Sequence, residues 1–144
     1  MQITQLIRLD LRAPINYIKT GKKKPDLHSI APENGEFFLC YNINPLQSRK
    51  IEPEREHLLG SLLFYGEKSK KKINGQEVSL PQGAYLFMQQ RSDQPLSQDQ
   101  WLDMAIEQQK DGLWERNKLK DLLYVRYLYE DGAFVTQVFR PIDC

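Results

Sequence analysis

Cysteine, histidine and long apolar runs are all scarce in this sequence. Its 144 residues include two cysteines and two histidines. The longest apolar run, Leu58–Tyr65, is interrupted by Gly60 and Ser61 and falls well short of the ~20 residues that span a bilayer. The first residues lack the basic leader and apolar stretch of a signal peptide. Cys40 and Cys144 form no spacing pattern, so we expect free thiols and a cytoplasmic protein.

An excess of either charge is also lacking. The chain has 20 Lys+Arg against 19 Asp+Glu, a formal net charge of +1, which argues against bulk attraction to nucleic acid or to an anionic membrane. A length of 144 residues is typical of one domain, so we expect a single domain over 1–144. Hydrophobic residues make up 40% of the chain, enough for a core and too many for a disordered tail.

No complete catalytic or metal-binding motif is present. His28 and His57 have no second histidine or cysteine at a ligand spacing, and the glutamates beside His57 are typical of a charged connection. Neither Ser61 nor Ser79 lies in a Gly-x-Ser-x-Gly context. The sequence therefore predicts no catalytic residue, no metal site and no cofactor, and an enzyme has the least support among the function classes.

Strand patterns dominate the chain. Six segments have the alternation or the compact apolar composition of strands: 3–11, 36–43, 58–65, 84–89, 122–129 and 133–140. Arg12–Gly35 is rich in Pro, Gly and Lys, which favours an irregular connection. Glu130-Asp131-Gly132 suits the turn of a final hairpin. Pro141, which has no amide hydrogen, is expected to end the last strand.

One helix is clearly indicated, over Ser97–Lys110. Ser97 and Gln100 have the spacing of a capping box, and apolar residues recur from Trp101 at three-to-four spacing. Gly112 is expected to stop the helix, after which Leu113 and Trp114 fold back onto the body. Strands surrounding one long helix predict an α+β fold with a mainly antiparallel sheet.

The stretch from Val78 to Ile142 resembles the GyrI-like small-molecule-binding domain. The resemblance rests on the strand entry Leu80–Phe87, the amphipathic helix from Ser97, and a closing strand Val135–Ile142 with a terminal Pro and aliphatic residue. It implies two strand-helix-strand-strand units related by pseudo-symmetry. It also implies a stand-alone ligand-binding domain without a DNA-binding part, because few residues precede the first strand.

Aromatic residues are the candidate ligand contacts. Tyr85, Phe87, Trp101 and Tyr124 are expected to wall a cleft by converging on it, although filling the core is the commoner role for any single aromatic residue. Similar domains that bind cations use a buried acid near the final hairpin. The corresponding strand here has no acid and offers Arg126, which either reaches into the cleft or, as arginines commonly do, faces solvent. The resemblance therefore implies a small aromatic ligand that is neutral or anionic.

A protein-protein interaction module without a small-molecule ligand is the alternative. Its aromatic residues would all fill the core. It would bind a protein partner through an open sheet edge or through the basic loops Lys22–Lys24 and Lys68–Lys72. Neither loop has neighbouring aromatics for base stacking, so nucleic acid is not the expected partner.

Overall fold

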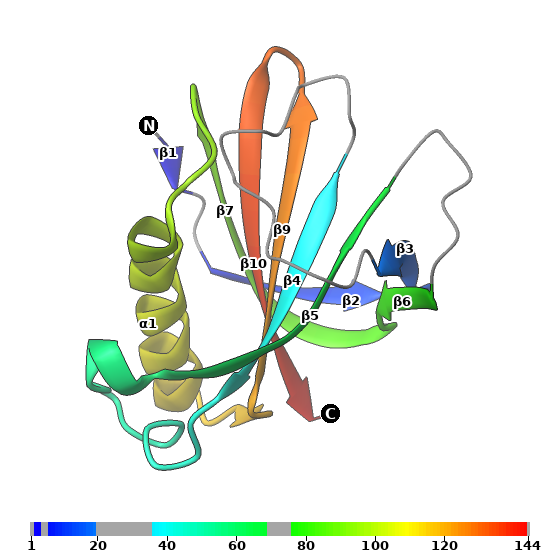
Figure 1. The fold of residues 1–144 in the computed structure, drawn as a ribbon. Helices are drawn as coiled ribbons and strands as arrows, with labels where there is room; N and C mark the ends of the chain where they lie inside the picture. Colours follow the sequence, from blue (N-terminus) through cyan, green and yellow to red (C-terminus); the bar gives the residue numbers. More distant parts are fainter. Residues whose placement is uncertain (1, 4–5, 20–35, 69–75, 144) are drawn as a thin grey trace.

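A curled antiparallel sheet and one long helix make up residues 2–3, 6–19, 36–68 and 76–143, the part of the chain that the computed structural model describes (Figure 1). The helix, α1, spans Gln98–Trp114, and a short 3-10 helix spans Arg55–His57. The described strands are β1 (Gln2–Ile3), β2 (Ile7–Leu11), β3 (Ile15–Lys19), β4 (Phe37–Ile43), β5 (Leu59–Glu67), β6 (Gln76–Leu80), β7 (Gly83–Ser92), β8 (Lys118–Leu119), β9 (Leu122–Glu130) and β10 (Ala133–Asp143).

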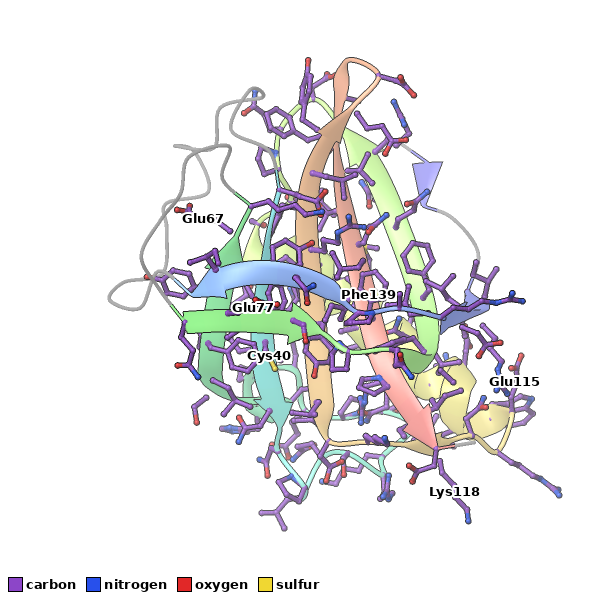
Figure 2. All side chains as sticks on the ribbon, turned by 90° about the vertical axis from the view of Figure 1, so that its right-hand side faces the viewer. Cys40, Glu67, Glu77, Glu115, Lys118 and Phe139 are labelled. Carbon is purple, nitrogen blue, oxygen red and sulfur yellow. The ribbon has the colours of Figure 1, made fainter. Side chains whose placement is uncertain are left out.

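The sheet curls because a two-stranded ribbon crosses one of its faces. Strands β7, β10, β9, β4 and β5 lie side by side in that order. One strand of this ribbon consists of β2 and β3, and the other consists of β6 and the first residues of β7. Their pairing runs from Ile7↔Phe87 to Lys19↔Gln76. Its β3 end also pairs with β5, through Ile18↔Glu67 and Lys19↔Gly66. Figure 2 shows β2, β3 and β6 passing in front of the main strands, which gives the sheet the form of a half-barrel.

The two faces of the sheet bury different sets of side chains. Helix α1 packs on the outer face, where Trp101 and Leu102 meet Leu39, Val125 and Val138. The inner face, beneath the ribbon, holds a separate aromatic cluster that is described below. Alternation along each strand produces this division because successive side chains point to opposite faces.

Helix α1 starts as predicted but ends later. The Ser97 side chain accepts from the Gln100 amide, and the Gln100 side chain accepts from Ser97, so the capping box is present. Gly112 does not stop the helix. It lies inside, where a Cβ would stand 2.5 Å from Leu86 Cδ1, so its role is close packing against the sheet. Trp114 does not fold back, since it is 79% exposed.

Two strand predictions need correction. The segment predicted as an irregular connection contains β3, whose Tyr17 is buried and whose partners, β6 and β5, are not readable from its local sequence. Pro141 does not end the last strand, which continues to Asp143. On one side of β10, pairing with β9 ends at Phe139 and pairing with β8 starts at Ile142. Pro141 lies between these two sets of paired residues, so its missing amide hydrogen interrupts neither the β9 pairing nor the β8 pairing.

The predicted fold class and the predicted final hairpin agree with the described structure. The fold is α+β with an antiparallel sheet, and the hairpin turn uses Asp131 and Gly132, both with positive φ. No helix of the described segments is long and apolar enough to cross a membrane. A second strand-helix-strand-strand unit would need a helix within 20–35, which lies outside the described residues, as do Lys22–Lys24 and 69–75.

Candidate functional site

The inner face of the sheet is filled by aromatic rings. Tyr85 packs edge-on against Tyr124 and Phe139, with ring centroids 6.2 and 5.6 Å apart, and Phe87 lies 5.0 Å from Phe139. The other buried members of this inner cluster are Tyr17, Phe38, Cys40 and Leu80. Cys40 and Phe139 mark the cluster at the centre of Figure 2, behind the ribbon. Six strands contribute to it, so the curl of the sheet is what assembles it.

A polar network closes this cluster on the side toward the β9–β10 turn. Arg126 donates through Nε to Tyr17 Oη and to Glu36 Oε2, both at 2.8 Å, and its Nη2 forms an ion pair with the same carboxylate. Tyr17 Oη donates to Glu36 Oε2 at 2.6 Å. The two charged side chains are 17% and 19% exposed. Arg126 therefore has its counter-charge within the protein.

Neighbouring amides complete the network. Arg126 Nη1 donates to Gln137 Oε1 at 3.0 Å, and Gln137 Nε2 donates to Gln89 Oε1 at 2.9 Å. Burial acts to raise the pKa of Glu36, but the Tyr17 hydrogen bond and the Arg126 charge outweigh it and hold that pKa below its usual range. Glu36 is consequently ionised at neutral pH, and the network is a satisfied pair and not a vacant anion site.

The side of the cluster near β8 is open. A hollow of about 130 Å³ lies there, between the β6–β7 bend, the start of β9 and the end of β10. Its walls include Tyr85, Tyr124 and Leu122, and Gly83 contributes open space, since nothing lies within 4 Å of where its Cβ would be. The other lining residues are Pro81, Gln82, Ala84, Lys120, Pro141 and Ile142. The lining is therefore more apolar than polar, with one amide, Gln82, and one charged residue, Lys120.

Few polar side-chain groups surround the hollow. Tyr85 Oη donates to Pro81 O, and Tyr124 lies opposite Cys40 across the β4–β9 pair. Burial raises the pKa of Tyr85 to about 12 and that of the Cys40 thiol to about 12. Both groups stay protonated at neutral pH. The fixed charge at the rim is therefore the ammonium of Lys120.

The five residues predicted to bind a ligand lie in four different places. Tyr85 and Tyr124 both line the hollow. Phe87 belongs to the same aromatic cluster but packs against Phe139 and does not line the hollow. Trp101 belongs to α1 and is fully buried against the opposite face of the sheet. Arg126 follows Tyr124 by two residues, roughly 7 Å along the strand, and belongs to the closed polar network.

Sequence reasoning missed two residues that matter here. Glu36 supplies the acid that the final hairpin lacks, from the residue before β4. No local signal identifies it, because the β4–β9 pairing connects segments far apart in the chain. Lys120 lies in the short connection between β8 and β9 and had no distinguishing neighbours.

A larger groove of about 400 Å³ lies on the outer side, between the start of α1 and β5. Its lining includes Arg55, which pairs with Asp99 at 3.7 Å and with Asp103, so these charges are already matched on the surface. None of the predicted ligand-binding residues lines it. Within the described segments no group of His, Cys, Asp and Glu could hold a metal ion.

Neither the models of known protein families nor the curated proteins include a match to this chain.

Proposed function

We propose that this chain is a cytoplasmic small-molecule-binding domain whose ligand occupies the hollow that Tyr85 and Tyr124 help to line. The observation that carries the proposal is the opening itself, a space of about 130 Å³ at one end of an otherwise filled aromatic interior. The sequence resemblance to GyrI-like domains, also built around aromatic ligand contacts, supports the same class of function. A membership of that family remains a prediction.

The size and lining of the hollow limit the ligand. An apolar cavity of roughly 150 Å³ accommodates a benzene-sized molecule, so the hollow of about 130 Å³ suits one small ring or one ring of a larger ligand. The rings of Tyr85 and Tyr124 offer apolar surface on its walls. The Tyr85 hydroxyl already donates to Pro81 O, which leaves it acceptor lone pairs.

A thermal-shift titration with benzyl alcohol tests this function. A ligand that binds only the folded state raises stability by RT ln(1 + [L]/Kd), so the melting temperature should rise with concentration as that relation requires. Leu122→Trp should abolish the rise, because Leu122 lines the hollow and the larger ring fills it. Leu63→Trp is the matched control, at a 46% exposed leucine on β5 outside the hollow. A rise that persists in Leu122→Trp, or no rise in the parent protein, would reject the proposal.

Binding of a protein partner is the second candidate function, and one feature of β5 favours it. No charged residue occurs between Leu58 and Gly66. Among the described strands β3 pairs with β5 only at Gly66 and Glu67, so the outer edge of the preceding residues is open. Uncharged open edges can accept another strand. However, register shifts interrupt the β4–β5 pairing, and such irregularity discourages edge pairing, which ranks this candidate second.

Light scattering coupled to size-exclusion chromatography, together with affinity capture by the purified chain, would test this second candidate. Leu63→Lys places a charge on the open edge and should abolish any association that uses it. An association that survives Leu63→Lys would exclude the β5 edge as the binding surface.

A further inference from the structure

We infer that the ligand of the hollow is a small planar anion, of which a monocyclic aromatic carboxylate is the simplest example, and that Lys120 binds its charge. The inference rests on the proposed function and goes further, because that function leaves a neutral and an anionic ligand equally open. It also moves the charged contact away from Arg126, whose guanidinium is matched by Glu36.

The position of Lys120 is fixed by its backbone. Its amide donates to Pro141 O at 2.9 Å, and its carbonyl accepts from Arg140 Nε at 2.7 Å. Arg140 is 1% exposed and is itself bound by Gln109 of α1, with Nη1 2.9 Å from Gln109 Oε1. The main chain at Lys120 is therefore held on two sides, while its side chain remains half-exposed at the rim of the hollow.

The charges around the rim favour an anion. Lys120 is the one charged residue among those that line the hollow within the described chain. Its Nζ lies 3.6 Å from Asp143 Oδ1, in an ion pair whose side chains are 52% and 58% exposed. Arg140 and Asp121 lie behind Lys120 and face each other at 3.9 Å. A cationic ligand would meet the Lys120 ammonium with no acid lining the hollow to offset it.

The existing partner of Lys120 is weak enough to be exchanged. Exposed ion pairs contribute about 0–1 kcal/mol because water screens both charges. A carboxylate carried by a ring inside the hollow would meet the same ammonium with part of the water excluded, where the attraction is stronger. Asp143 is thus a built-in competitor for the Lys120 charge, and its removal should favour the ligand.

Calorimetric titration with benzoate, benzyl alcohol and benzylamine tests the inference, because the three compounds share one ring and differ in charge. Benzoate should bind most tightly and benzylamine most weakly. Lys120→Gln should weaken benzoate about tenfold, the effect of losing roughly 1.4 kcal/mol, and should leave benzyl alcohol within about twofold. Asp143→Asn should strengthen benzoate. Lys118→Gln is the matched control, since Lys118 is exposed, lies across from Asp143 and does not line the hollow.

The outcomes separate the inference from the proposed function. Benzyl alcohol binding that equals or exceeds benzoate binding would overturn the inference and leave the proposed function standing. Equal losses of benzoate and benzyl alcohol in Lys120→Gln would overturn it as well, because a general disturbance of the hollow acts on both. Failure of all three compounds to bind would remove both proposals. Urea titration of each variant confirms that it is folded before its binding is compared.

Discussion

Arg126 donates through Nε to Glu36 Oε2 at 2.8 Å, although 90 residues separate the two in the chain. The pair spans from β9 to the residue before β4 and closes one side of the aromatic interior. Tyr17 binds both partners, so β3 joins the same network. Arg126, which the sequence predicts as a ligand contact, thereby joins β9, β3 and the residue before β4.

Replacing Glu36 should make the free energy of unfolding depend less on pH in the acidic range. Because the folded pKa of Glu36 is depressed below its ordinary value of 4.5, its stabilising effect is present above that value and is lost as pH falls through the folded pKa. Glu36→Gln should reduce the free energy of unfolding by roughly 2 kcal/mol at pH 7, measured by urea titration. The difference from the parent protein should shrink below pH 4. A constant difference would contradict the pair's role, and exposed Glu77→Gln should change little.

Arg140 is expected to be the most sensitive charged residue of the described chain. It is 1% exposed, its Nε and Nη1 bind Lys120 O and Gln109 Oε1, and its Nη2 faces Asp121. Arg140→Met should cost roughly 3 kcal/mol, because the carbonyl and amide that it binds lose their donor while buried. Arg140→Lys should rescue only part of this loss, since an ammonium lacks the planar fork.

Urea titration provides the measurement for both Arg140 variants. Lys110→Met is the control, at an exposed position on α1. Equal stability of Arg140→Met and the parent protein would show that the buried guanidinium contributes no net stability.

Cys40 should be inert in the folded protein. It is 1% exposed, and burial raises the pKa of its thiol to about 12. In a Cys144→Ser variant, Cys40 is the single thiol. Its reaction with iodoacetamide should stay slow between pH 7 and 9 and should become fast in denaturant. Rapid labelling at pH 8 without denaturant would mean that the interior opens readily.

Gly66 should tolerate no side chain, because it lies where the ribbon meets the main sheet. A Cβ there would stand 2.8 Å from Tyr17 Cβ, 2.9 Å from Val78 Cγ2 and 3.0 Å from Phe38 Cε1. Gly66→Ala should therefore lower the free energy of unfolding by roughly 2 kcal/mol through overpacking. Ser61→Ala, on the exposed part of the same strand, should be nearly neutral. Thermal denaturation compares the two, and equal effects would argue against tight packing at the crossing.

Local sequence determined those features that depend on neighbours in the chain. The Ser97–Gln100 capping box set the start of α1, and Asp131-Gly132 supplied the positive φ angles of the last hairpin. Alternation along β7 placed Tyr85 and Phe87 on one face of that strand, where both belong to the inner cluster. Each of these results follows from spacing within a few residues, which a single sequence contains.

Only the tertiary structure decided which side chains those residues contact. Trp101 and Tyr124 are both aromatic, yet the sheet separates them. Trp101 lies between α1 and the outer face, and Tyr124 lies on the inner face. Glu36 became the partner of Arg126, and Lys120 the charge at the rim, through strand pairings and turns that join distant segments. Neighbours across strands are set by the global packing of apolar faces, and local propensity carries no record of that choice.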